Sequence, residues 1–554
     1  MAWGIACWLG ITAPIAWAQS EPGARVDALF AAWDKPDSPG AALAVVRDGE
    51  VIYRRAYGQA QLEHAAPNTP RTVFHVASLS KQFTAFAIHL LVQDGKLALD
   101  DEVRKHLPEL KAGAGVITVR HLLHHTSGLR DQWNLLMLAG LRLDDVITEG
   151  DVLGLLWQQR ELNFAPGSEM LYSNSGYTLL ALIVQRVSGQ SLKAFAQARI
   201  FGPLGMKDTG FQESYSLPIK GRAYSYRPTR EGWRYVALSY STVGASSLMT
   251  TVEDLALWER NVNDAKVGGL AVLAALQTRG RLSSGGEIDY ASGLGHGQHR
   301  GLPIVEHGGA DASYRAFLLR FPQQRLSVVV LGNAGNLNAG LLARQVADVY
   351  LEGSVAAQAP TKVTPEVWLD AAALAPFVGD FEMRPGFVLS FTAQGTQLRV
   401  QATGQPVFPL FASATDRFFV KAFEADVRFD APGADGKVHT ATWRQGGRDL
   451  PLKRVLLTSL APAAESLAAC AGDYYSDELR TLYTLSLRDG RVLLRYPRGE
   501  LELKPLATDR YAVAFPIEQL SVKRRADGAC ISLAVDTGRV RQLMFQRVTL
   551  TPLM

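Results

Sequence analysis

The sequence predicts an α/β fold, with an antiparallel sheet flanked by helices, followed by two small antiparallel all-β barrel domains. Strand-like runs lie near both ends of residues 19–355, and the region between them has helical periodicity. A segment typical of linkers, residues 359–365, comes next. Beyond it, residues 369–457 and 464–554 share short sequence marks, which indicates an internal repeat. With 554 residues, the chain is long enough for these three domains.

The first 18 residues are predicted to be a secretory signal peptide. They are apolar and end in Ala16-Trp17-Ala18, a small-x-small pattern typical of cleavage sites. The first positively charged residue is Arg25, so the basic start of such a peptide is missing, and a buried N-terminal helix is the alternative. No later stretch reaches the roughly 20 apolar residues of a membrane span. We therefore expect a periplasmic or secreted protein without a membrane span.

The α/β domain is expected to begin with two strands and to end with two strands and a helix. The first two strands lie around the turn Arg47-Asp48-Gly49-Glu50. The first strong helix has Gly95 as its stop signal. In chain order, the expected elements are strands within Ala41–Tyr57, helices at about 78–93 and 175–187, strands at 317–321 and 326–331, and a helix at about 341–351.

The two β domains are expected to be barrels or sandwiches that arose by repetition. The eight residues at 374–381, Leu-Ala-Pro-Phe-Val-Gly-Asp-Phe, recur at 467–474 as Leu-Ala-Ala-Cys-Ala-Gly-Asp-Tyr. A second mark places Gly-Lys-Val before Trp443 and Gly-Arg-Val before Phe545 at the same spacing. Short β-prone runs separate the marks in both segments.

Two cysteines, Cys470 and Cys530, remain after cleavage of the predicted signal peptide. An oxidising compartment would allow them to pair. Two buried thiols fit the sequence equally well, and neither cysteine has metal-ligand spacing. Cys470 occupies the repeat position of Phe377, which favours a buried thiol there, so both interpretations stay open.

The composition excludes several classes of protein. Hydrophobic residues make up 47% of the chain and charged residues 20%, which is typical of a globular protein and not of a disordered one. Lys and Arg number 57 against 53 Asp and Glu, a net charge of +4. So small an excess, without a long basic run, argues against a nucleic-acid partner.

A serine and a lysine three residues apart mark the start of the first strong helix. Ser78 and Lys81 would lie on one face of that helix, within hydrogen-bonding reach. A serine hydroxyl needs a nearby base to act as a nucleophile, and a desolvated lysine can be that base because burial lowers its pKa. No other serine in the chain has a lysine three residues further on. The motif alone fits an N-cap serine beside a surface lysine equally well.

Two further motifs follow downstream. In Tyr172-Ser173-Asn174 the outer side chains can project from a loop, where a tyrosinate can take the serine proton, as an alternative to the lysine, and an asparagine amide can orient a substrate carbonyl. In His307-Gly308-Gly309-Ala310 the glycines would let a substrate backbone approach closely, and the N–H of Ala310 would form an oxyanion hole with that of Ser78. Singly, these motifs are also typical of a helix-capping loop and a plain turn.

Together, the three motifs resemble the penicillin-recognising, β-lactamase-related serine hydrolases. Their order is that of the family, and residues 74–84 resemble its nucleophile segment along their whole length. Residues 121–129, 164–177 and 244–255 are similar to other recurring segments, so the resemblance covers about 25–352. It implies a beta-lactamase/transpeptidase-like catalytic domain, and the two C-terminal β-barrel domains resemble those of the D-aminopeptidase-like branch.

The resemblance also implies that the reaction needs no metal or organic cofactor, and it implies roles for individual residues. It further implies that the C-terminal domains help to shape the substrate cleft. The implied catalytic residues are Ser78 as acylated nucleophile, Lys81 as base and Tyr172 as proton relay, and the implied substrate-binding residues are Asn174, His307, Gly309 and Ala310.

The third motif bears on the substrate. The β-lactamase and carboxypeptidase branches usually place Lys-Thr-Gly where this chain has His307-Gly308-Gly309. Lysine offers a permanent cation to a substrate carboxylate, whereas a histidine with an unperturbed pKa near ~6.5 is mostly neutral at pH ~7.

We therefore expect an exported serine hydrolase that acts on amides or esters through a Ser78 acyl-enzyme, with a D-aminopeptidase releasing N-terminal D-amino acids as the first candidate. The alternatives are a β-lactamase or penicillin-binding protein, an esterase, and a non-catalytic scaffold. The expected partners are a small-molecule or peptide substrate and, as a candidate assembly, a second copy of the chain in a homodimer.

Overall fold

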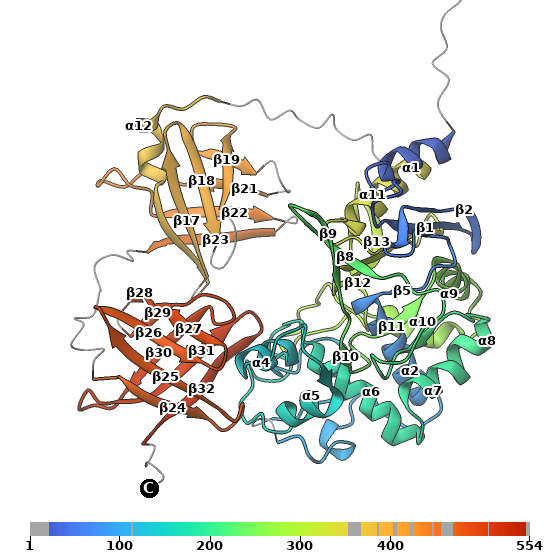
Figure 1. Cartoon of the computed structure of the whole chain (residues 1–554), viewed down its shortest axis with the longest axis horizontal. Helices are drawn as coiled ribbons and strands as arrows, with labels where there is room; N and C mark the ends of the chain where they lie inside the picture. The colour runs from blue at the N-terminus through green and yellow to red at the C-terminus, as the bar shows by residue number, and fades with distance from the viewer. Residues whose placement is uncertain are drawn as a thin grey trace, which may run out of the picture.

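The computed structural model describes residues 21–549, except 112, 114, 353–366, 385–386, 403–406, 421–424, 446–447, 456–468 and 508. The predicted signal peptide (1–18) and the predicted linker (359–365) therefore lie outside the described residues. Three bodies follow one another along the chain, an α/β domain and two β domains (Figure 1). None of the helices in the described ranges has the length and apolar character needed to cross a membrane.

A six-stranded antiparallel sheet forms the centre of the α/β domain, and both ends of the domain contribute strands to it. The strand order is β12-β13-β14-β15-β1-β2. The first strand pairs with the last one, with Ala41 opposite Gly332, as the strand-like runs at both ends predict. The strands are β1 (Ala41–Arg47), β2 (Glu50–Tyr57), β12 (Gly295–His299), β13 (Leu302–Asp311), β14 (Tyr314–Phe321) and β15 (Leu326–Gly332).

Helices cover both faces of this sheet. Alternate residues of β1 show this directly: Ala41, Leu43 and Val45 belong to the core under α1 and α11, whereas Ala42 and Ala44 belong to the core under the other helices. The longer helices are α1 (Pro22–Phe30), α2 (Ser80–Gln93), α5 (Glu149–Leu156), α6 (Asn174–Ser188), α9 (Val252–Asp264), α10 (Gly269–Gln277) and α11 (Ala339–Tyr350).

Short elements complete the α/β domain. Those that matter for the site are the 3₁₀ turn η1 (Ala77–Leu79) and the helix α4 (Gln132–Leu138). The others are η2 (Val103–Lys105), α3 (Val119–Leu123), α7 (Leu192–Ala196), η3 (Gln197–Phe201) and α8 (Gly202–Leu204), and the strands β3 (Gln59–Gln61), β4 (Ala66–Pro67), β5 (Phe74–His75), β6 (Ile147–Thr148), β7 (Gly210–Phe211), β8 (Ser225–Thr229), β9 (Gly232–Val236), β10 (Tyr240–Ser241) and β11 (Leu248–Thr250).

The three helices that the sequence predicts are present, with small differences at their ends. The predicted helix 78–93 is α2, which starts at Ser80 because Ser78 lies in the preceding 3₁₀ turn η1. The predicted helix 175–187 is α6, which stops where Gly189 adopts a left-handed conformation with φ of 74°. The predicted helix 341–351 is α11, whose N-terminus is capped by Asn338.

The first β domain is a closed eight-stranded antiparallel barrel with its own aromatic core. Before its first strand lie α12 (Ala371–Leu374) and η4 (Ala375–Phe377). Its strands are β16 (Gly379–Arg384), β17 (Phe387–Gln394), β18 (Gln397–Ala402), β19 (Val407–Ala412), β20 (Arg417–Val420), β21 (Ala425–Phe429), β22 (Thr440–Gln445) and β23 (Arg448–Val455).

The second β domain is a nine-stranded antiparallel sheet that curls into a nearly closed barrel. Its two edge strands, β27 and β28, are consecutive in the chain with only Leu503 between them. The strands are β24 (Gly472–Ser476), β25 (Thr481–Arg488), β26 (Arg491–Tyr496), β27 (Gly499–Glu502), β28 (Lys504–Ala507), β29 (Arg510–Ala512), β30 (Gln519–Arg524), β31 (Cys530–Thr537) and β32 (Val540–Val548).

The two β domains support the first repeated sequence mark and contradict the second. Gly379 and Gly472 each open the first strand of their domain, with φ of 143° and 142°. Each lies beside an arginine of the strand paired with that first strand, Arg454 on β23 or Arg547 on β32. The strands β23 and β32 are thus equivalent, whereas the second mark equates β22 with β32. That prediction is wrong because a glycine-containing turn before a strand recurs throughout antiparallel barrels.

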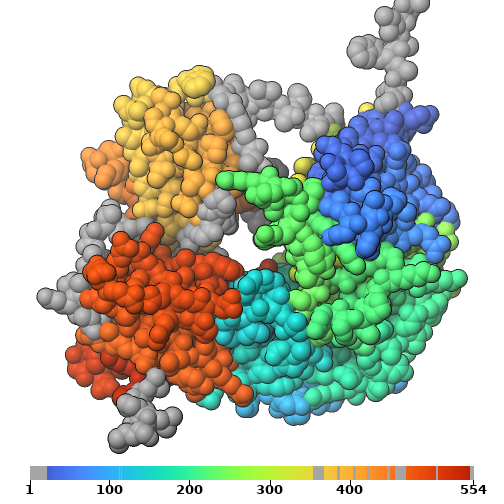
Figure 2. Space-filling model, in the orientation of Figure 1, coloured from blue at the N-terminus to red at the C-terminus, as the bar shows by residue number. Residues whose placement is uncertain are grey.

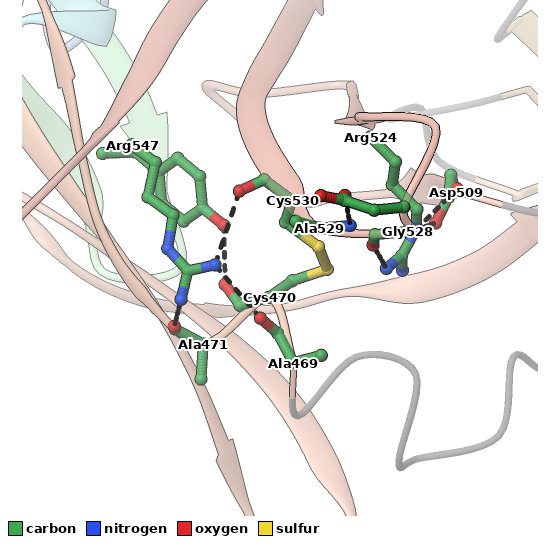
Figure 3. The surroundings of a disulfide bond; sticks show 11 residues. Ala469, Cys470, Ala471, Asp509, Arg524, Gly528, Ala529, Cys530 and Arg547 are labelled. Carbon is green, nitrogen blue, oxygen red and sulfur yellow. Dashed lines mark hydrogen bonds and ion pairs between the residues drawn. A yellow bond between two sulfur atoms is a disulfide. The ribbon is translucent and has the colours of Figure 1, made fainter.

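A disulfide joins the two cysteines of the second β domain. Cys470 and Cys530 are both buried, their Cα atoms lie 5.2 Å apart, and 60 positions separate them in the sequence. The bond links the segment that leads into β24 to the first residue of β31 (Figure 3). Arg547 reinforces the same corner by donating hydrogen bonds to the carbonyls of Ala469 and Ala471. The sequence left open whether the two cysteines pair or stay as buried thiols, and in the structure they form a disulfide.

Removing this disulfide should destabilise the second β domain. In the double variant C470A/C530A, no disulfide closes the loop of 60 residues in the unfolded chain. The unfolded chain therefore has more conformational entropy, and the free energy of unfolding should fall by up to about 4 kcal/mol. Thermal unfolding followed by calorimetry should show a lower midpoint for this domain and an unchanged one for the first β domain, which lacks the bond. Identical melting profiles for the variant and the wild type would contradict the prediction.

Candidate active site

A cleft of about 820 Å³ lies where the sheet edge, the helical layer and the second β domain meet. All the predicted site residues except Lys81 line it, and Lys81 lies directly behind Ser78. The structure therefore brings together residues from η1, α2, the loop before α6, the first residue of α6 and β13. The predicted residues that line the cleft are Ser78, Tyr172, Asn174, His307, Gly309 and Ala310.

Ser78 lies on a strained turn at the base of this cleft. The preceding Ala77 has φ of 47°, a left-handed conformation that is unfavourable for a residue with a Cβ. Such strain is often found at functional sites, where the surrounding structure holds it in place. The turn directs the chain from β5 into α2 and leaves Ser78 half-buried in the cleft lining.

Lys81 lies one helical turn further on and is fully buried. Its Nζ donates to Ser78 Oγ at 3.1 Å, to Asn174 Oδ1 at 2.9 Å and to the carbonyl of Ala245 at 2.7 Å. Burial lowers the pKa of Lys81 to about 7, while the negative charge of Asp131 acts in the opposite direction. Lys81 is therefore not a surface lysine, and a large fraction of it is neutral near pH ~7.

Tyr172 packs on the other side of this pair. Its ring packs against His125 in a tilted arrangement, with the ring centroids 4.1 Å apart, and Lys81 Nζ lies 4.9 Å from its centroid. Burial raises the pKa of Tyr172, and a hydrogen bond with Ser78 only partly offsets that effect. The environment thus separates the two pKa values: Lys81 can accept a proton near neutral pH, and Tyr172 stays a phenol that can donate one.

Asn174 connects Lys81 to a buried carboxylate that the sequence did not reveal. Its backbone N–H and its Nδ2 both donate to Asp131 Oδ2, at 2.7 and 2.8 Å, while its Oδ1 accepts from Lys81. Asp131 also caps α4 by accepting from the N–H of Trp133. The amide of Asn174 is thereby fixed with Nδ2 and Oδ1 in assigned positions.

His307 is neutral in this environment. Its Nδ1 lies 2.7 Å from the Gly308 carbonyl and its Nε2 lies 3.0 Å from the Tyr290 hydroxyl, so both ring nitrogens already have partners. Burial lowers the pKa of His307 to about 4, and the charge of Lys81 lowers it further. This residue therefore offers no cation to a substrate carboxylate.

Gly309 is a glycine for a reason other than the expected approach of a substrate backbone. A Cβ at this position would lie 2.2 Å from the Val76 carbonyl oxygen and 3.2 Å from the Ser78 nitrogen. The absence of a side chain lets β13 pack directly against the nucleophile turn. It thereby brings Ala310, which is exposed at the cleft, next to the backbone of Ser78.

The strand β13 also presents a free edge in the cleft. Its neighbour β12 pairs only with Leu302–Glu306, so the stretch from His307 to Asp311 has no β12 partner. An unpaired strand edge offers backbone N–H and C=O groups to an extended peptide or amide.

The second β domain completes the cleft with Arg539, which lies in the turn between β31 and β32. Its guanidinium lies 3.6 Å from Asp131 Oδ2 and 4.9 Å from the ring centroid of Tyr172. The structure thus places a residue of the C-terminal part in the cleft, as the resemblance implies. Local motifs gave no signal for Arg539 itself, because its contact with Asp131 joins distant domains.

A buried ion pair holds this turn in place. Arg130 donates to Glu478 at 2.7 Å and to the carbonyls of Arg541 and Gln542, and it is 1% exposed. Tyr483 adds a hydrogen bond to the Leu138 carbonyl, and one continuous apolar core spans both domains. Figure 2 shows the red second β domain pressed against the cyan segment that Figure 1 labels α4. The second β domain is therefore docked firmly on the α/β domain.

Comparison with known proteins finds a matching family model and similar proteins. A family model described as Beta-lactamase matches residues 26–351. A D-aminopeptidase of Gluconobacter oxydans is 31% identical over 297 residues, 53% of this chain, and the match spans only 56% of that relative. A D-aminopeptidase of Cereibacter sphaeroides is 28% identical over 534 residues, covering 92% of this chain and 96% of that protein.

Among solved structures, the octameric penicillin-binding protein homologue from Pyrococcus abyssi has a TM-score of 0.53 at 21% identity. The match covers 84% of this chain and 96% of that one, which shows a shared fold. The predicted fold class is confirmed: a beta-lactamase/transpeptidase-like α/β domain precedes two antiparallel β domains.

Proposed function

This chain belongs to the beta-lactamase family and is a serine hydrolase, and from that premise we propose that it cleaves amides of D-amino acids through an acyl-enzyme on Ser78. The observation that carries the proposal is the contact of 3.1 Å between Nζ of the buried Lys81 and Oγ of the half-buried Ser78. It joins a hydroxyl to a base whose pKa of about 7 suits proton transfer at neutral pH.

The proposed reaction uses the cleft residues in two half-reactions. Neutral Lys81 takes the proton of Ser78 as its Oγ attacks the substrate carbonyl, and the N–H groups of Ser78 and Ala310 stabilise the oxyanion. Tyr172 delivers a proton to the leaving amine as the C–N bond breaks, and protonated Lys81 returns a proton to Tyr172. In the second half-reaction, neutral Lys81 takes a proton from the water that attacks the ester and passes it to Ser78 Oγ as the free carboxylic acid leaves. Asn174 and the free edge of β13 orient the substrate.

Two observations support a D-aminopeptidase as the specific activity. The relatives described above are D-aminopeptidases, one of them matched over nearly the whole chain. In addition, neutral His307 stands where a lysine would hold the carboxylate of a β-lactam or a peptide C-terminus.

A β-lactam or penicillin-type substrate is the second candidate. Arg315 and Arg539 line the same cleft, so a substrate carboxylate would find a cation even without the lysine. One relative, the Penicillin-binding protein 4* of Bacillus subtilis, is 26% identical over 415 residues, which cover 72% of this chain.

We also propose that the protein is exported. The Cys470–Cys530 disulfide supports this, because such bonds persist mainly in oxidising compartments. The predicted signal peptide is consistent with it. The homodimer stays a prediction.

A substrate panel tests the specificity. Purified protein should hydrolyse D-alanine p-nitroanilide at least about tenfold faster than the L isomer, measured as kcat/KM, a difference of roughly 1.4 kcal/mol in the transition state. The N-acetyl-D-alanine anilide, which lacks the free amine, is the matched control and should be a poorer substrate. Rapid hydrolysis of a chromogenic cephalosporin without any anilide cleavage would favour the second candidate instead.

A further inference from the structure

We propose that Arg539 of the second β domain is a positioning residue that keeps Lys81 in its neutral form by compensating the charge of Asp131. This inference rests on the proposed role of Lys81 as the base for Ser78. It goes further, because it makes the protonation of that base depend on a side chain from a different domain.

The turn that carries Arg539 is fastened to the α/β domain through its backbone. The Arg539 carbonyl accepts from Asn163 Nδ2 at 2.9 Å and from the Asp131 N–H at 3.3 Å, and the Arg541 N–H donates to Asn163 Oδ1 at 2.8 Å. These bonds do not involve the guanidinium. The charged group is therefore held at the cleft by its backbone, and its side chain remains 41% exposed.

Asp131 is a buried carboxylate near two basic side chains, Arg539 and Lys81. It is 1% exposed, and Arg539 lies 3.6 Å from its Oδ2. The same oxygen accepts two hydrogen bonds from Asn174, whose Oδ1 accepts from Lys81. A buried carboxylate stabilises any nearby cation. Without Arg539, the charge of Asp131 would act on Lys81 uncompensated by this guanidinium, and the protonated form of Lys81 would become more stable.

The other groups around Lys81 do not replace Arg539. The carboxylate of Asp311, at the end of β13, has other hydrogen-bond partners. Tyr240 donates to its Oδ2, and His75 Nε2 lies 3.3 Å from the same oxygen. Burial lowers the pKa of His125 and of His307, so these rings carry no charge near pH ~7. The titratable and charged groups that face Lys81 are Asp131, Arg539, Asp311, Tyr172, Tyr177, His125 and His307.

The two charges act on Lys81 in opposite directions. Asp131 raises the pKa of Lys81, and Arg539 lowers it, on top of the larger effect of burial. Removing the guanidinium should therefore raise the pKa of Lys81 above its value of about 7. Because only the neutral amine is a base, activity should then appear at a higher pH.

The test is the rate at which a fluorophosphonate labels Ser78 as a function of pH, which needs no knowledge of the natural substrate. The acid limb of this pH profile is the range in which the labelling rate rises with pH, and in R539Q it should move up by about half to one pH unit. The labelling rate near pH ~6 should then fall about three- to tenfold, while the plateau at high pH stays within about twofold. Because Arg539 is 41% exposed, the variant should fold, and circular dichroism checks this.

Two matched variants separate charge from shape. R539K keeps a positive charge at this position, so the pH midpoint of its labelling rate should lie close to that of the wild type. R541Q removes an arginine of the same hairpin that pairs with Glu169 instead, at 3.0 Å, and should leave the acid limb in place.

The outcomes distinguish the proposal from the function on which it rests. The proposed role of Arg539 is wrong, while the acyl-enzyme stands, in either of two cases in which the wild type is labelled. In the first, the labelling rate of R539Q has the same pH midpoint as that of the wild type. In the second, the midpoint of R539K shifts as far as that of R539Q. If the S78A variant labels as fast as the wild type, the proposed function falls and the role of Arg539 falls with it.

Discussion

Replacing Ser78 with alanine should abolish turnover of every amide and ester substrate, with kcat falling by about 10⁴-fold or more. Lys81 Nζ contacts the Ser78 hydroxyl at 3.1 Å, and its other two partners are the oxygens of Asn174 and Ala245, which are not nucleophiles. No second hydroxyl among these contacts can take over. The oxyanion-stabilising backbone groups remain, but without a nucleophile they contribute only weak residual catalysis.

The measurement has two independent parts. Hydrolysis of a generic ester and of a D-amino-acid anilide reports turnover, and the mass of the intact protein after treatment with a fluorophosphonate reports the acyl-enzyme-like adduct. Ser168→Ala is the matched control, because Ser168 is an exposed loop residue whose hydroxyl donates to the Ala165 carbonyl at 2.7 Å. A stoichiometric adduct on S78A at the wild-type rate would show that another residue is the nucleophile.

The nucleophile and base could be located from the sequence because their contact is local. Ser78 and Lys81 are three positions apart, and a helical turn alone brings them together. The Tyr172-Ser173-Asn174 motif was found for a similar reason, since it lies at the start of a helix with a clear periodic pattern. For these residues the tertiary structure adds burial, and burial distinguishes a base from a surface lysine.

The remaining parts of the site depend on tertiary contacts that no local pattern encodes. Asp131 reads as an ordinary helix cap, and Arg539 reads as a basic residue in a β-turn. Only the docking of the second β domain places the guanidinium 3.6 Å from that carboxylate. Gly309 was identified correctly as a site residue for an incomplete reason, because the close approach it permits is that of Val76, within the protein.

The fold shows the same division between local and distant information. The first repeated mark located both β domains because a glycine with positive φ opens each one, at Gly379 and Gly472. The second mark failed because turn residues alone do not say which strand closes a barrel. The disulfide stayed undecided because two cysteines 60 positions apart pair only when the fold brings the segment before β24 to the start of β31.

Replacing Lys81 with methionine should lower kcat/KM by about 10³-fold, the usual order for loss of a general base. Methionine has a similar volume and retains the packing, but it cannot accept the Ser78 proton. Burial raises the pKa of Tyr172, so this phenol is not a substitute base near neutral pH. The remaining activity should therefore rise only in strongly alkaline solution, where hydroxide or ionised Tyr172 can act.

The pH profile identifies the base more sharply than the loss of activity does. In the wild type, kcat/KM should rise as the pH passes through about 7, because Lys81 is neutral above its lowered pKa. Lys81→Arg supplies the matched control: arginine keeps a positive charge beside Ser78 but does not lose its proton in this range. If the charge alone mattered, K81R would retain activity, whereas a base requires K81R to be as inactive as K81M. If kcat/KM of K81M still rose with pH near pH ~7, the titrating group would be a residue other than Lys81.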